Sequence, residues 1–85
     1  MNLIAYPNPF SETTTIAYQL TEASQIEISF VDVLGKQIVL VQKENQSAGK
    51  HQISINKNDL NLSNGIYLLK LNVDEKELLT RLIIQ

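Results

Sequence analysis

Hydrophobic residues in this sequence recur mostly at every second position, in short runs that turn residues separate at intervals of roughly ten residues. The clearest example is the stretch in which Ile26, Ile28 and Phe30 alternate with Glu27 and Ser29. Side chains at alternate positions of a strand share one face of a sheet. The sequence therefore predicts an all-β fold in which each strand has one buried face.

Turn residues divide the chain into strands. Pro7 and Pro9 fix φ and end the first run. The residues from Asp32 to Gly35 predict a tight turn, because Asp can bond the backbone ahead of it and Gly can take a positive φ. Further breaks are expected in the polar stretches 44–49 and 57–64 and in the charged turn 74–76. We therefore predict seven strands, at 3–6, 13–20, 25–32, 36–44, 51–56, 65–73 and 77–84.

Seven antiparallel strands in a chain of 85 residues cannot bury their apolar faces as one open sheet, so two sheets packed face to face are expected. The residues from Leu62 to Tyr67 have the spacing of a tyrosine corner, in which a Tyr near a strand start donates its hydroxyl to upstream backbone. The predicted fold is a seven-stranded antiparallel immunoglobulin-like β-sandwich with Greek-key connections. We expect one domain, residues 1–85, and interpret Met1 as the start of a domain excised from a larger protein.

Charge and composition exclude several classes of function. The chain has 7 basic and 9 acidic residues and a net charge of -2, without blocks of either sign, so neither nucleic acid nor an anionic membrane is an expected partner. It has no cysteine, which rules out disulfides, cysteine-based zinc sites and a thiol nucleophile. The apolar runs are only about four residues long, too short to span a bilayer. If the protein is exported, its signal peptide is expected upstream of this chain.

Catalysis finds little support in the sequence. Nucleophilic hydrolysis needs a base beside Ser or Thr, and His51 is the only histidine. It is in phase with Ile53 and Ile55, which predicts a partly buried position or one at the rim of the core. We therefore expect no catalytic residue and no enzymatic activity.

The acidic residues are the only candidate ligands for a metal ion. Asp74, Glu75 and Glu77 could supply oxygens to calcium, as could Asp59 with neighbouring asparagines. Neither group has EF-hand spacing, and there is no glycine-rich phosphate loop. Solvated turn charge is the interpretation we adopt, with no metal or cofactor.

The aromatic residues suggest an alternative function. Tyr18, Phe30 and Tyr67 are in phase with core residues, which leaves Tyr6 and Phe10 as exposed aromatic side chains. A pair of this kind could form the sugar platform of a small carbohydrate-binding module. A purely structural spacer domain is the other alternative.

Six short motifs follow one another along nearly the whole chain: Tyr6-Pro7-Asn8-Pro9-Phe10; Thr15-Ile16-Ala17-Tyr18; Asp32, Gly35 and Lys36; Gly49, His51 and Ile53; Leu62, Gly65, Ile66 and Tyr67; and Arg81-Leu82-Ile83-Ile84. Together they resemble the C-terminal sorting domain of type A cargo in the type IX secretion system of Bacteroidota. Two features depart from the family pattern. Many members carry Lys where Arg81 stands, and many end on or near a basic residue, whereas this chain ends at Gln85.

The resemblance implies a domain at the C-terminus of a larger cargo protein. Such a cargo crosses the inner membrane by a conventional signal peptide and folds in the periplasm. The outer-membrane translocon then recognises the domain. In many members a sortase-like peptidase removes it and attaches the cargo to surface lipopolysaccharide, so the implied destination is the cell surface or the medium.

The last strand is the candidate recognition element. An edge strand has unpaired backbone groups that can pair with a partner strand. Leu79, Arg81 and Ile83 form the face opposite the predicted core, and the hairpin Asp74-Glu75-Lys76-Glu77 adjoins it. We predict that these residues carry recognition. The alternative is that Arg81 only prevents aggregation of an apolar stretch.

The remaining motif residues have structural interpretations. Pro7-Asn8-Pro9 could be a rigid spacer that presents the junction with the cargo to a peptidase. We favour the simpler interpretation that it kinks an edge strand and seats Phe10 against the core. Gly35, Gly49 and Gly65 are expected to serve turns. Exposed sheet edges also make a weak homodimer an expected property.

Overall fold

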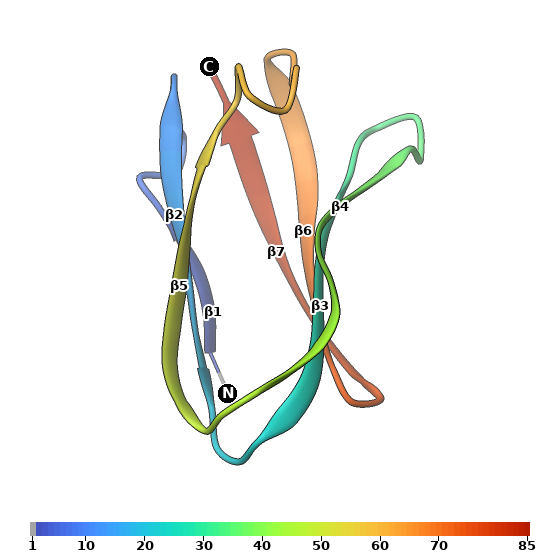
Figure 1. Ribbon diagram of the computed structural model, residues 1–85. Coiled ribbons are helices and arrows are strands. Elements are labelled where there is room, and N and C mark those ends of the chain that lie inside the picture. The colour runs from blue at the N-terminus through green and yellow to red at the C-terminus, as the bar shows by residue number, and fades with distance from the viewer. Residues whose placement is uncertain (1) are drawn as a thin grey trace.

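The computed structural model describes residues 2–85 and contains seven strands, with no helix among those residues (Figure 1). Met1, which we interpret as the start of an excised domain, lies outside the described residues. The all-β prediction is confirmed. The strands are β1 (Asn2–Tyr6), β2 (Thr13–Leu20), β3 (Ser24–Val31), β4 (Gln37–Gln46), β5 (Gly49–Asn56), β6 (Gly65–Val73) and β7 (Lys76–Ile84).

The strands form two antiparallel sheets, ordered β1-β2-β5 and β4-β3-β6-β7. The pairs β3–β4 and β6–β7 stay within one sheet, whereas the chain changes sheets between β2 and β3, between β4 and β5, and between β5 and β6 (Figure 1). This arrangement agrees with the predicted immunoglobulin-like sandwich. Greek-key connectivity remains a prediction.

Alternate residues of both sheets meet in one hydrophobic core. Ile16 comes from the first sheet, Ile28, Phe30 and Leu69 come from the second, and all four side chains are 0% exposed. Burying a large apolar side chain contributes about 1.5–3 kcal/mol, so this core is the main source of stability. Its members are Phe10, Ile16, Tyr18, Leu20, Ile26, Ile28, Phe30, Ile55, Leu62, Tyr67, Leu69, Leu71, Val73, Leu82 and Ile84.

The end of the fourth strand was predicted wrongly. Residues 44–49 were expected to form a polar loop, but β4 continues to Gln46, which pairs with Ser24, and only Ser47 and Ala48 connect it to β5. The cause is irregular pairing, because the β3–β4 register shifts between Ile26 and Ile28 and again immediately after Ile28. Bulges of this kind lengthen one strand relative to its partner. They also disturb the alternation on which the sequence prediction relied.

The Asp32 turn has the predicted geometry. The Asp32 Oδ1 atom accepts hydrogen bonds from the backbone N–H groups of Leu34 and Lys36, each at 2.9 Å. The Gly35 N–H donates to the Asp32 carbonyl at 3.0 Å, and Gly35 has a φ of +86°. Asp32 and Gly35 are therefore explained by the backbone demands of this turn.

The tyrosine corner is also confirmed. The Tyr67 hydroxyl donates to the Ser63 carbonyl at 2.7 Å, and the Tyr67 ring packs against Phe30 with ring centroids 6.1 Å apart. Leu62 is buried in the connection that precedes β6. This connection crosses from one sheet to the other, so the corner fixes the start of β6.

His51 lies at the rim of the core, as predicted from its phase. Its ring stacks on Tyr18 with centroids 5.4 Å apart, and its Nε2 atom donates to the Ser47 carbonyl at 2.8 Å. The Tyr18 hydroxyl donates to the Gln46 side chain. Burial raises the pKa of Tyr18 above its ordinary value of 10.0, and the nearby Glu44 charge acts in the same direction.

Tyr18 should therefore make stability fall at alkaline pH. The unfolded chain loses the Tyr18 proton near pH 10.0, before the folded chain does, so the free energy of unfolding declines as pH rises above that value. A tyrosine absorbance titration should contain a component above pH 10.0 that is missing in Tyr18→Phe. A component lost in Tyr18→Phe that titrates at or below pH 10.0 would contradict the assignment.

Candidate recognition surface

The segment Pro7–Phe10, here called the N-terminal clasp, lies along the C-terminal half of β7. The Asn8 Nδ2 atom donates to the Arg81 carbonyl at 2.7 Å, and Asn8 Oδ1 accepts from the Ile83 N–H at 3.0 Å. The Asn8 side chain thus hydrogen-bonds to both a carbonyl and an N–H on the same edge of β7. In Figure 1, β1 lies beside β7, with the clasp connecting β1 to β2.

Phe10 completes the clasp. Its N–H donates to the Ile83 carbonyl at 3.0 Å, its carbonyl accepts from the Gln85 N–H at 2.8 Å, and it forms a parallel bridge with Ile84. The Phe10 side chain is only 2% exposed. The expectation of an exposed Phe10 is therefore wrong, because the backbone pairing with β7 directs the ring between the sheets. Phe10 lies in the core, where the simpler interpretation of Pro7-Asn8-Pro9 places it.

The inner side of the clasp is also bonded. The Thr14 hydroxyl, on a residue that is 2% exposed, donates to the Pro7 carbonyl at 2.8 Å. Both the Tyr6–Pro7 and the Asn8–Pro9 peptide bonds are cis. The opening motif is thus tied to β2 on one side and to β7 on the other, and it links the two sheets.

The clasp changes what β7 can offer a partner. β7 is an edge strand, as predicted. Its outward backbone groups at Arg81, Ile83 and Gln85 are engaged by Asn8 and Phe10, however. Alternate residues of a strand point their backbone groups to the same side. Strand addition to β7 is therefore restricted to its first half.

The side chains of β7 remain accessible on the outer face of the sheet. Leu79 is 51% exposed, Arg81 is exposed and Ile83 is half-buried. The register places Arg81 beside Leu68 and Ile83 beside Ile66, both of which are exposed apolar residues on β6. We call the set Val39, Ile66, Leu68, Leu79, Arg81 and Ile83 the outer face.

Three members of the outer face were missed by sequence reasoning. Val39, Ile66 and Leu68 lie on β4 and β6, and each is at least 39% exposed. The signal was present, because each lies opposite the core in its strand. An apolar residue on the outer side of one strand does not by itself indicate a binding site. The strand order was also needed, because it places β6 beside β7.

Two basic groups border the apolar part of this face. Lys70 lies between Ser29 and Leu79 in the register and forms an ion pair with Glu77 at 3.4 Å. Arg81 lines a depression together with Val31, Val33 and Leu68. A partly exposed ion pair adds little stability, so Lys70 and Glu77 remain available to a partner.

The predicted hairpin recognition element is built around Asp74. Asp74 has a φ of +54°, its N–H donates to the Gln25 carbonyl at 2.8 Å, and its Oδ1 accepts from the Gln25 N–H at 3.1 Å. This reciprocal pair ties the turn to the start of β3. Glu75 and Lys76 are exposed at the same end of the sandwich.

The candidate metal-binding residues do not come together in the part of the chain that the structure describes. Among residues 2–85, no three His, Asp or Glu side chains form a group that could hold a metal ion. Over the same residues, no helix is long and apolar enough to cross a membrane. Gly49 and Gly65 have φ values of +120° and +150°, and they lie at the starts of β5 and β6 as turn positions.

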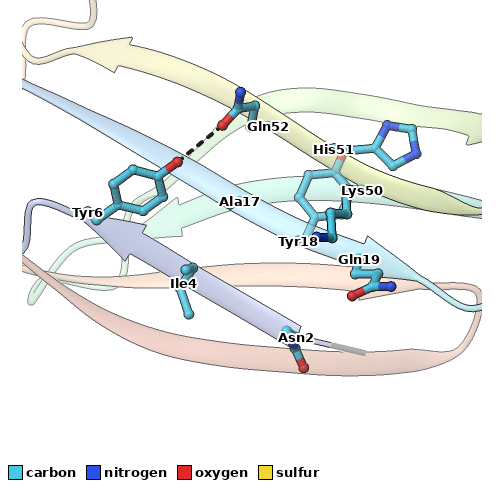
Figure 2. A pocket seen from close by; sticks show the side chains of 9 residues that line it. All are labelled: Asn2, Ile4, Tyr6, Ala17, Tyr18, Gln19, Lys50, His51 and Gln52. Carbon is cyan, nitrogen blue, oxygen red and sulfur yellow. Dashed lines mark hydrogen bonds between the residues drawn. The ribbon is translucent and has the colours of Figure 1, made fainter.

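Tyr6 is the one aromatic residue left for a sugar platform. It is 49% exposed on the outer side of the first sheet, and its hydroxyl donates to the Gln52 side chain at 3.2 Å (Figure 2). Ile4, Ala17 and Lys50 line the same depression. Because Phe10 is buried, the two-aromatic platform expected for a carbohydrate-binding module is absent from residues 2–85.

The comparison with known families decides the identity of the chain. A model of the secretion system C-terminal sorting domain matches residues 4–85. This chain is a type IX C-terminal sorting domain. No curated protein and no solved structure matches it. Membership implies a tail that the secretion machinery recognises and export to the cell surface or the medium.

The geometry explains why a sorting domain would carry its opening motif. An amide side chain at position 8 suits the clasp, because its Nδ2 donates to the Arg81 carbonyl while its Oδ1 accepts from the Ile83 N–H. The clasp also needs a large apolar side chain at Phe10 to fill the core. The motif is thus a structural device that holds β7 in place.

Replacing Asn8 should loosen β7 without removing core volume. Asn8→Ala deletes two hydrogen bonds of the sorting domain, so we expect a loss of about 1–3 kcal/mol in the free energy of unfolding, measured in urea. Asn8→Asp should also destabilise at neutral pH, because a carboxylate cannot donate to the Arg81 carbonyl. Asn45→Ala is the control, because Asn45 is an exposed residue of β4. Equal effects at the two asparagines would show that the clasp is not stabilising.

Proposed function

We propose that this sorting domain directs an upstream cargo protein across the outer membrane, and that the translocon recognises the outer face together with the Asp74–Glu77 hairpin. The observation that supports the recognition surface most directly is the group of exposed apolar residues on the paired strands β6 and β7, with Val39 on β4 two strands from β6. Leu68 and Leu79 lie outside the hydrophobic core of this domain. Contiguous exposed apolar residues commonly mark a protein interaction site.

The clasp supports recognition through side chains. Because Asn8 and Phe10 occupy the second half of the β7 edge, a partner at Arg81 and Ile83 meets their side chains on the outer face. Arg81 gives this apolar surface a fixed positive charge. The competing interpretation is that Arg81 only keeps an exposed strand soluble. The two interpretations differ in whether Arg81→Gln reduces export or only solubility.

The route of the cargo belongs to the same proposal. We infer that residues 1–85 are the last domain of a larger exported protein, which enters the periplasm by an upstream signal peptide. A sortase-like peptidase then removes the domain at the cell surface, and the cargo is anchored to lipopolysaccharide or released.

Export of a reporter tests the proposal. Residues 1–85 are fused behind a periplasmic reporter in a host with a working type IX system, and the fraction of reporter outside the cell is measured. We expect Leu79→Gln and Leu68→Gln to lower export several-fold, because each removes apolar surface from the outer face. Ile4→Gln is the matched control, since Ile4 is 54% exposed on the other sheet.

Thermal unfolding of each purified variant separates recognition from folding. Leu79→Gln and Leu68→Gln should unfold close to the unsubstituted domain, because both side chains lie outside the core. Equal export of the two outer-face variants and the control would contradict the proposed recognition surface. Export of a reporter whose domain lacks β7 would contradict the sorting role and favour a structural spacer.

A further inference from the structure

Three of the four edge strands are protected against pairing with another chain. The edges of the two sheets are β1, β5, β4 and β7. β1 is five residues long and stops at Pro7. β4 has an irregular register and carries Lys43 and Glu44, and the C-terminal half of β7 is covered by the clasp. Short length, proline, bulges, charge and cover are the usual ways in which proteins protect sheet edges.

β5 has none of these protections. It pairs with β2 in an unbroken register from Gly49, opposite Leu20, to Asn56, opposite Thr13. The strand is eight residues long, contains no proline and carries one charge, on Lys50. In Figure 1 its free side faces away from β2. A long, regular and nearly uncharged edge is a template for strand addition.

The backbone groups on that free side can be assigned. The Lys57 N–H donates to the Glu12 carbonyl at 3.0 Å, which extends the β2–β5 ladder by one step. Backbone groups alternate in direction along a strand, so the odd-numbered residues of β5 face β2. The N–H and C=O groups of Lys50, Gln52 and Ser54 therefore point to the free edge.

We propose that a second copy of this chain pairs antiparallel with β5 across a two-fold axis and joins two three-stranded sheets into one. This inference is independent of the proposed recognition surface, which lies on the other sheet. A two-fold pairing centred on Ile53 places Gln52 opposite Ser54 of the second copy. Lys50 then lies opposite Asn56 of the second copy, so no like charges meet.

The side chains of β5 also favour pairing with β5 of a second copy of the chain. Ile53 points toward the core side of the sheet but is only half-buried, because β5 is the last strand. In the centred register, Ile53 packs against Ile53 of the second copy and extends the apolar layer. The contact is limited to one strand, and interfaces of this size belong to weak complexes. The association should therefore depend on concentration.

Sedimentation velocity over a range of concentrations tests the inference. The unsubstituted chain should shift from monomer toward dimer as concentration rises. Ser54→Pro removes an outward N–H and blocks strand addition, while it leaves the ladder to β2 intact because the Ser54 N–H faces away from β2. We expect Ser54→Pro to remain monomeric and Ser54→Thr to dimerise. A monomer at every concentration for the unsubstituted chain would overturn the inference.

Leu79→Pro is the matched variant on the rival edge, because Leu79 lies on the open half of β7. It should leave the dimer unchanged, and loss of the dimer in Leu79→Pro but not in Ser54→Pro would overturn the assignment to β5. Should Ser54→Pro fail to fold, amide exchange of the unsubstituted chain decides. The Gln52 and Ser54 amides should gain protection at high concentration only, and unchanged exchange at both would contradict the pairing.

Discussion

The proposed recognition through side chains of β7 depends on one contact, the pairing of Asn8 and Phe10 with the end of that strand. Through it the first connection of the chain holds the last strand, and the two sheets are joined along one side of the sandwich. The same contact settles which surfaces are free. It occupies backbone groups at the end of β7 and leaves the side chains of the outer face exposed.

The core residues and the proposed recognition residues are two separate sets in this molecule. The core is formed by alternate residues of both sheets, with Ile28, Phe30 and Leu69 fully buried at its centre. The charged groups and the exposed apolar residues lie on the outer sides and at the turns. A sorting domain of this construction can vary its outer surface without altering its fold, because the two sets of residues alternate along the same strands.

Much of the fold could be predicted from local sequence. The phase of β3 and β6, the Asp32 turn and the tyrosine corner at Tyr67 depend on neighbours within a few residues, so their signals are complete in the sequence. The burial of Phe10 could not be predicted in this way, because its partners Ile83 and Gln85 lie at the other end of the chain. The extension of β4 was missed for a related reason, since a bulge breaks the alternation that predicts a strand. The outer face required strand order, which places Leu68 beside Arg81.

Methyl NMR can show whether the translocon binds the folded domain through its outer face. The domain is labelled at the methyl groups of Ile, Leu and Val and titrated with detergent-solubilised translocon. On binding, the methyl signals of Val39, Ile66, Leu68 and Leu79 should broaden. The signal of Ile4, on the other sheet, should be unaffected, and the signal of Ile28 should keep its native chemical shift. Broadening confined to the Ile4 side, or loss of the native Ile28 signal on binding, would contradict recognition of a folded sandwich through its outer face.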